Sequence, residues 1–107
     1  MTAHDPAAAL EQAADLIDPD KGGRWITGTF TDDNGGYCIL GALSHVTGNE
    51  ASAKAPWPDE VTAFARGYKR LRAMLGADPA AWNDQDCLDG AQAANVLRKA
   101  AEIERAS

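Results

Sequence analysis

The sequence predicts a mainly α-helical domain with a minor β component. Apolar residues recur at intervals of three and four along most of the chain, and Asp-Pro pairs and glycines stand where helices would begin or end. Because the 107 residues contain no linker-like tract, we expect one domain over residues 1–107. We expect four helices, at residues 6–17, 38–47, 59–75 and 88–104, and one β-hairpin or extended segment at residues 24–38.

The first helix is predicted by the pair Asp5-Pro6. An aspartate side chain can cap free backbone N–H groups, and proline is tolerated at the first helical position because its missing N–H has no intrahelical partner there. Leu10, Ala14 and Ile17 then fall on one face. Pro19 disfavours helical angles at the residue before it, so we expect the helix to end near Asp18.

The segment at 24–38 has the composition of a hairpin. Residues 24–31 (RWITGTFT) are rich in aromatic and β-branched side chains, which favour a strand. Asn34-Gly35 then supplies the positive backbone angles that a tight turn needs. The return strand would be very short, because helical pattern resumes at Tyr37.

The later helices are predicted by their apolar spacing. Residues 37–46 (YCILGALSHV) are nearly all apolar, which indicates a short helix buried on most sides. The clearest amphipathic stripe follows a candidate cap at Asp59 and consists of Val61, Phe64, Tyr68, Leu71 and Leu75. Asp78-Pro79 is interpreted as a turn, and Asp89 with Gln92 has the form of a capping box for the last helix.

Charge and composition exclude several classes of protein. The formal net charge of −6 repels polyphosphate at long range, so nucleic acid is not the expected partner. No apolar run approaches the roughly 18 residues of a membrane span, and the first residues lack the pattern of a signal peptide. We therefore expect a cytoplasmic protein without a membrane partner, in which Cys38 and Cys87 stay reduced rather than forming a disulfide.

Cys38 is the one candidate nucleophile. A thiolate at a helix start is favoured by exposed N–H groups. His45 lies two helical turns away, a rise of about 10.5 Å, which is too far for it to act as a hydrogen-bonded base. The alternative interpretation is structural, with Cys38, Gly41 and Ala42 forming a small-residue groove for another helix and His45 at its rim.

The sequence contains no complete metal or cofactor motif. Zinc ligands usually come in closely spaced pairs, and the available atoms of His4, Cys38, His45 and Cys87 lack that spacing. There is no Gly-rich phosphate loop, nucleophile elbow or HExxH. We therefore expect no metal, no cofactor and no assembled catalytic site.

The candidate binding residues are one tryptophan and one cationic cluster. Trp57 stands between two prolines in a loop and could anchor a protein contact, whereas Trp25 and Trp82 are interpreted as lids on the core. Arg66, Lys69 and Arg70 form the basic face of the third helix. That face is a solvated helix side, a docking surface for another protein or, as the least favoured alternative, a contact for the phosphates of a nucleic acid.

Three short signatures occur together: Trp25 before a glycine-rich turn, Cys-x-x-Gly-Ala-Leu from Cys38, and Trp82-Asn83-Asp84 before an alanine-rich helix. Over roughly residues 7–103 the chain resembles a small domain family of unknown function found in actinobacteria and their bacteriophages. The resemblance implies a single cytoplasmic domain and gives no activity or ligand. It also implies that Asn83 and Asp84 bond nearby backbone and fix the start of the last helix; the rival hypothesis joins them to Cys38 in a hydrolase-like group.

We therefore expect a non-enzymatic protein-binding accessory module, serving a phage or mobile element and engaging a host protein through Trp57 and the basic helix face. Two alternatives stay open. One is a cysteine-dependent enzyme that uses Cys38, and the other is a self-associating structural protein.

Overall fold

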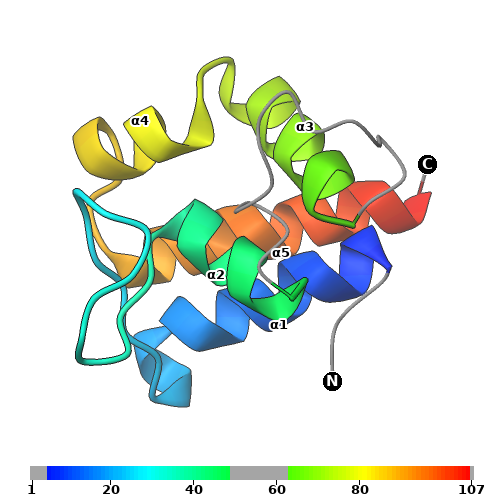
Figure 1. The fold of residues 1–107 in the computed structure, drawn as a ribbon. Coiled ribbons are helices and arrows are strands. Elements are labelled where there is room, and N and C mark those ends of the chain that lie inside the picture. The colour runs from blue at the N-terminus through cyan, green and yellow to red at the C-terminus, as the bar shows by residue number, and fades with distance from the viewer. Residues whose placement is uncertain (1–4, 49–62, 107) are drawn as a thin grey trace.

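The computed structural model describes residues 5–48 and 63–106, and these form five α-helices and one 3-10 turn (Figure 1). The helices are α1 (Pro6–Ile17), α2 (Ile39–Val46), α3 (Ala63–Leu75), α4 (Pro79–Gln85) and α5 (Gly90–Ala106), and the 3-10 turn is η1 (Pro19–Lys21). The mainly helical prediction is confirmed. None of the described helices is long and apolar enough to cross a lipid bilayer.

Helices α1 and α5 run antiparallel and share the largest interface in the described fold (Figure 1). Alanines line much of their buried surface, which lets two helix backbones approach closely: Ala9, Ala13, Ala14, Ala93, Ala94, Ala100 and Ala101. Ion pairs also join the two helices. Arg98 on α5 contacts Asp18 at 2.7 Å and Asp15 at 3.1 Å, and Arg105 on α5 pairs with Glu11 on α1. The alanine-rich composition therefore has a structural use here.

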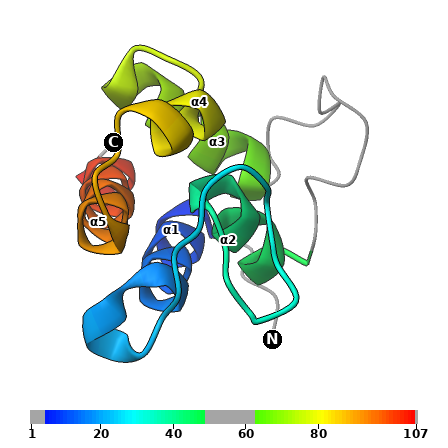
Figure 2. The ribbon, with the colours of Figure 1, turned by 90° about the vertical axis from the view of Figure 1, so that its left-hand side faces the viewer.

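Larger side chains fill the space between this pair and the other helices. Helix α2 packs against α1, and α3 packs against both α1 and α5 (Figure 2). The largest fully buried apolar side chains come from four helices: Leu10, Ile17, Ile39, Leu43, Phe64, Leu71 and Leu97. Of the stripe predicted for the third helix, Phe64 and Leu71 are buried and Tyr68 and Leu75 are half-buried, while Val61 lies outside the described residues.

Helix boundaries agree closely with the prediction where they can be compared. Asp5 caps α1 by accepting from the N–H of Ala8 at 2.9 Å, and α1 spans the predicted residues. Asp89 accepts from the N–H of Gln92 at 2.8 Å, while the Gln92 side chain accepts from the N–H of Leu88. The predicted start of the third helix at residue 59, with Asp59 and Val61, lies outside the described residues.

Helix α4 was not predicted, because its start was interpreted as a turn. Asp78 caps it by accepting from the N–H of Ala81 at 3.3 Å, and Pro79 is its first residue. This is the same arrangement as Asp5-Pro6 in α1. Tyr68 on α3 donates to the Asp78 carboxylate at 3.0 Å, which ties the capping residue to the preceding helix.

The predicted hairpin at 24–38 is wrong, and an irregular loop takes its place. Within the described chain, β-pairing is limited to isolated bridges from Tyr37 to Trp25 and to Thr31. The Asn34-Gly35 turn does form, because Asp32 accepts from the N–H groups of Asn34 at 3.0 Å and Gly36 at 2.7 Å. These backbone donors, the Gly36 N–H foremost, hold the pKa of the Asp32 carboxyl below its usual value.

Candidate functional site

The three signature segments meet around the side chain of Asn83. This asparagine is fully buried on α4, and its amide oxygen accepts from the Trp25 indole N–H at 2.7 Å and from the Ile39 backbone N–H at 3.0 Å. Its amide nitrogen donates to the Ile26 carbonyl and to the Asp84 carboxylate, both at 3.1 Å. Three of these partners come from the 24–38 loop and the start of α2, namely the Trp25 indole N–H, the Ile26 carbonyl and the Ile39 N–H, so Asn83 fastens both segments to α4.

This Asn83 cluster also explains why no hairpin forms. The Ile26 carbonyl and the Gly28 N–H, which a partner strand would need, bond instead to Asn83 and to Asp84 (3.0 Å). Side chains of α4 therefore take the place of a second strand. The expectation that Asn83 and Asp84 fix the start of the last helix is corrected accordingly, since they lie within α4 and bond the loop.

Cys38 is the N-cap of α2 and is buried. Its sulfur accepts from the Gly41 N–H at 3.3 Å, and burial raises the pKa of the thiol above its usual value. A neutral, covered thiol is a poor nucleophile. Among the described residues, no hydrogen bond joins the Cys38 sulfur to Asn83, Asp84 or His45. The geometry therefore gives no support to a hydrolase-like group.

Gly41 faces the 24–38 loop rather than another helix. A Cβ built on this glycine would lie 1.8 Å from the Phe30 carbonyl oxygen, and that same oxygen accepts from the Cys38 N–H at 3.1 Å. The small-residue groove is thus filled by loop backbone, which corrects the predicted helix contact. His45 is exposed, and its ring lies 5.1 Å from that of Tyr37 between centroids. The Cys-x-x-Gly signature is a helix start built to receive the loop.

The described residues contain no group of three or more His, Cys, Asp or Glu side chains that could hold a metal ion. Cys38 and Cys87 are free cysteines, and burial raises the pKa of Cys87 as well. His4 lies outside the described residues. Trp25 and Trp82 pack half-buried against the core, in line with their interpretation as lids.

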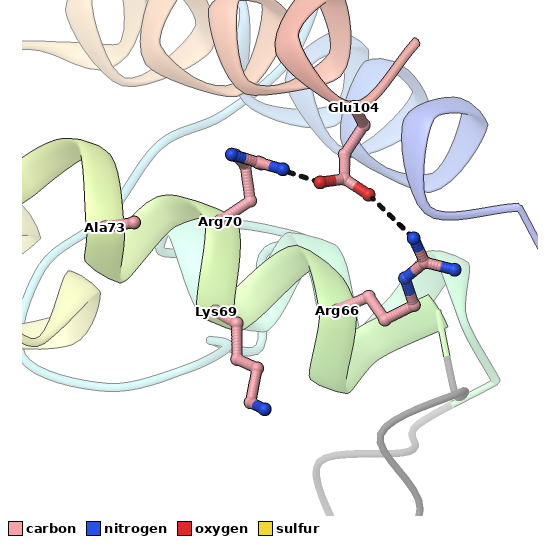
Figure 3. Close-up of a pocket in the computed structure, with 5 residues that line it drawn as sticks. All are labelled: Arg66, Lys69, Arg70, Ala73 and Glu104. Carbon is pink, nitrogen blue, oxygen red and sulfur yellow. Dashed lines mark hydrogen bonds and ion pairs between the residues drawn. The ribbon is translucent and has the colours of Figure 1, made fainter. Parts of the chain in front are cut away.

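The predicted basic face of α3 borders a recess of about 340 Å³, which we call the arginine recess (Figure 3). Arg66, Lys69, Arg70 and Ala73 line it from α3, and Glu104 lines it from α5. Arg70 bonds the Glu104 carboxylate at 2.6 Å, and Arg66 approaches it at 3.6 Å. The lining of the recess thus contains three cations and one carboxylate, and two of the cations contact that carboxylate.

The two arginines and the lysine are arranged differently. Figure 3 shows Arg66 and Arg70 on either side of Glu104, whereas the Lys69 side chain extends away from it. The Glu104 side chain is only 6% exposed, while those of Arg66 and Arg70 are 52% and 29% exposed. Each guanidinium carries five N–H donors, so one carboxylate occupies only part of their capacity. The outer parts of both groups face solvent.

Glu104 is the member of the arginine recess that sequence reasoning missed. It follows Leu97, Ala100 and Ala101 on the buried side of α5, and a glutamate at such a position needs a charged partner. That spacing was the available signal. Trp57, the other predicted binding residue, lies outside the described residues.

The fold and these two clusters define a small helical domain with a hydrogen-bonded loop at one end and a cationic recess on α3. The chain belongs to a family of unknown function, DUF6197, whose model matches residues 1–103. No curated protein and no solved structure matches the chain.

Proposed function

We propose that this protein is a non-enzymatic binding module that docks on an acidic segment of another protein through the arginine recess. The observation that carries the proposal is the Glu104 carboxylate between Arg66 and Arg70, because it displays the chemistry that the recess recognises. Guanidinium groups bind carboxylates through paired N–H donors, and the exposed parts of both arginines are available for a second one.

Charge also favours a protein partner over nucleic acid. The net charge of −6 opposes any long polyanion, whereas a short acidic segment meets mainly the local cations of α3. An electrostatic contact of this kind would give specificity and a fast association rate rather than high affinity by itself. Trp57, the apolar anchor expected from its place between two prolines, would add the affinity.

The proposed biological role is that of an accessory factor of an actinobacterial phage or mobile element, acting in the cytoplasm on a host protein. This part rests on the resemblance of the three signatures and on the alanine-rich composition. No observation favours the alternative enzyme, because its only candidate nucleophile is buried with a raised pKa. The other alternative, a self-associating structural protein, would bind further copies of this chain instead of a host protein.

The test is a pull-down from nuclease-treated lysate of the source organism or its host. The double variant Arg66→Gln/Lys69→Gln removes two cations and leaves the close Arg70–Glu104 pair intact. Lys21→Gln/Lys99→Gln is the matched control, because it changes the net charge by the same amount and neither lysine lines the recess. A Trp57→Ala arm tests the predicted anchor.

We expect one stoichiometric protein with the wild type and the control, and its loss with Arg66→Gln/Lys69→Gln. Capture that is equal in both double variants would refute the recess as the docking surface. If no bait captures another protein and light scattering shows that the purified wild type forms oligomers, the proposal is refuted in favour of self-association.

A further inference from the structure

The turn at residues 32–36 carries an asparagine followed by glycine in an exposed position. Asn34 and Gly35 are both exposed, and Gly35 has a backbone φ of 79°. The turn is held by its flanks, because the Asp32 side chain accepts from Asn34 N–H and Gly36 N–H, and Asp32 N–H donates to the Gly36 carbonyl at 3.2 Å. Among the hydrogen bonds of the described residues, none uses the Gly35 N–H.

We propose that Asn34 is a site of spontaneous deamidation, with water as the co-reactant. The Gly35 backbone nitrogen loses its proton to solvent base and attacks the Asn34 side-chain carbonyl carbon. A C–N bond forms, the bond to the side-chain NH₂ breaks, and ammonia leaves with a proton. Water then opens the resulting succinimide at either carbonyl, which yields aspartate or isoaspartate.

The surroundings of Asn34 favour this reaction over the same reaction elsewhere in the described chain. Glycine has no Cβ, so nothing shields the attacking nitrogen at residue 35. Asn83 is fully buried, and its amide oxygen and nitrogen are both engaged in hydrogen bonds. Asn95 lies inside α5 and precedes the β-branched Val96, so helical bonding and a side chain both hinder attack there.

Modification at this site alters the loop that covers the start of α2. Isoaspartate adds one methylene to the backbone between residues 34 and 35, which the two hydrogen bonds to Asp32 cannot accommodate unchanged. Either product also places a new negative charge beside Asp32 and Asp33. The Phe30 carbonyl, which receives the N–H of Cys38, belongs to the same loop. The loop should therefore hold less firmly to α2.

The experiment is incubation of the full-length purified protein at mildly alkaline pH and physiological temperature over days. Peptide mapping by mass spectrometry then locates the gain of mass that accompanies conversion of amide to acid, and isoaspartate methyltransferase labelling identifies the iso form. A synthetic peptide of residues 31–38 serves as the unfolded reference, and Asn34→Gln as the protein control.

We expect aspartate and isoaspartate to accumulate at residue 34, while Asn83 and Asn95 keep their amides both in the wild type and in the Asn34→Gln protein. The acidic fraction, separated by anion exchange, should have a lower thermal midpoint than the unmodified protein. An intact Asn34 after the reference peptide has converted would overturn the proposal, as would equal conversion at Asn95. An unchanged midpoint in the acidic fraction would overturn the structural consequence.

Discussion

Replacing Asn83 by alanine should remove a large share of the stability of this domain. The substitution leaves three groups without their partner: the Ile39 N–H, the Trp25 indole N–H and the Ile26 carbonyl. The Ile39 N–H is buried, so its loss costs about 1–3 kcal/mol, and the two half-buried groups cost about 1 kcal/mol each. We therefore expect a decrease of about 3–5 kcal/mol in the free energy of unfolding, out of the roughly 5–15 kcal/mol typical of a domain.

Urea denaturation followed by tryptophan fluorescence and by circular dichroism measures this change. Asn95→Ala on the exposed side of α5 is the control, and we expect its effect to stay within about 0.7 kcal/mol of wild type because only helix propensity changes. Trp25→Phe removes a single bond to Asn83 and should cost about 1 kcal/mol. A loss below about 1 kcal/mol for Asn83→Ala would refute the role of Asn83 as the fastening point of the loop.

Three further substitutions or conditions test the same description. Gly41→Ala puts a Cβ against the Phe30 carbonyl oxygen and should cost at least about 2 kcal/mol in urea denaturation; a neutral effect would mean that the loop is not seated there. The Asp20 N–H and Arg98 lower the pKa of Asp18 in the folded state. The ionised Asp18 side chain therefore adds to the free energy of unfolding at pH values above its unfolded pKa of about 3.9. That stabilisation is lost as the pH falls through the folded-state pKa. The stability gap between wild type and Asp18→Asn should thus narrow below about pH 4, and a constant gap would contradict this. Iodoacetamide at pH 8 should alkylate Cys87 before Cys38, which is buried with a raised pKa; equal rates in the native protein would show that Cys38 is accessible.

Local signals predicted most of the helices because those signals act over short distances. Asp5-Pro6 and the Asp89/Gln92 box each satisfy N–H groups within their own first turn, and the structure uses both pairs in this way. The same signal is present at Asp78-Pro79, which is interpreted from the sequence as a turn and which the structure uses to begin α4. Helix α4 was therefore missed although its Asp-Pro start signal is present in the sequence.

The hairpin could not be ruled out from sequence, because its competitor is a long-range interaction. Residues 24–31 have strand composition, but the Ile26 carbonyl and the Gly28 N–H bond to Asn83 and Asp84, more than fifty positions away. Neither periodicity nor turn chemistry carries that information. The family model matches residues 1–103, and the structure adds that the three signature segments of this chain meet at one asparagine.

The arginine recess was predicted only in part, because one of its residues comes from a helix that is distant in the sequence. The basic face of α3 follows from helical spacing, so Arg66, Lys69 and Arg70 could be found in the sequence. The carboxylate that organises two of them comes from α5, and only the packing of α3 on α5 brings Glu104 there. The separate direction of Lys69 is likewise a property of the folded chain (Figure 3).

Titration of the wild type and the two double variants with an oligoglutamate peptide tests the proposed recognition of acidic segments most directly. We predict saturable binding that weakens with added salt, retained in Lys21→Gln/Lys99→Gln. In Arg66→Gln/Lys69→Gln the affinity should fall by about 2- to 30-fold, since two exposed charge contacts contribute about 0.4–2 kcal/mol. Equal affinity in both double variants, or no binding to the wild type at low salt, would contradict the assignment of the arginine recess as a receptor for acidic segments.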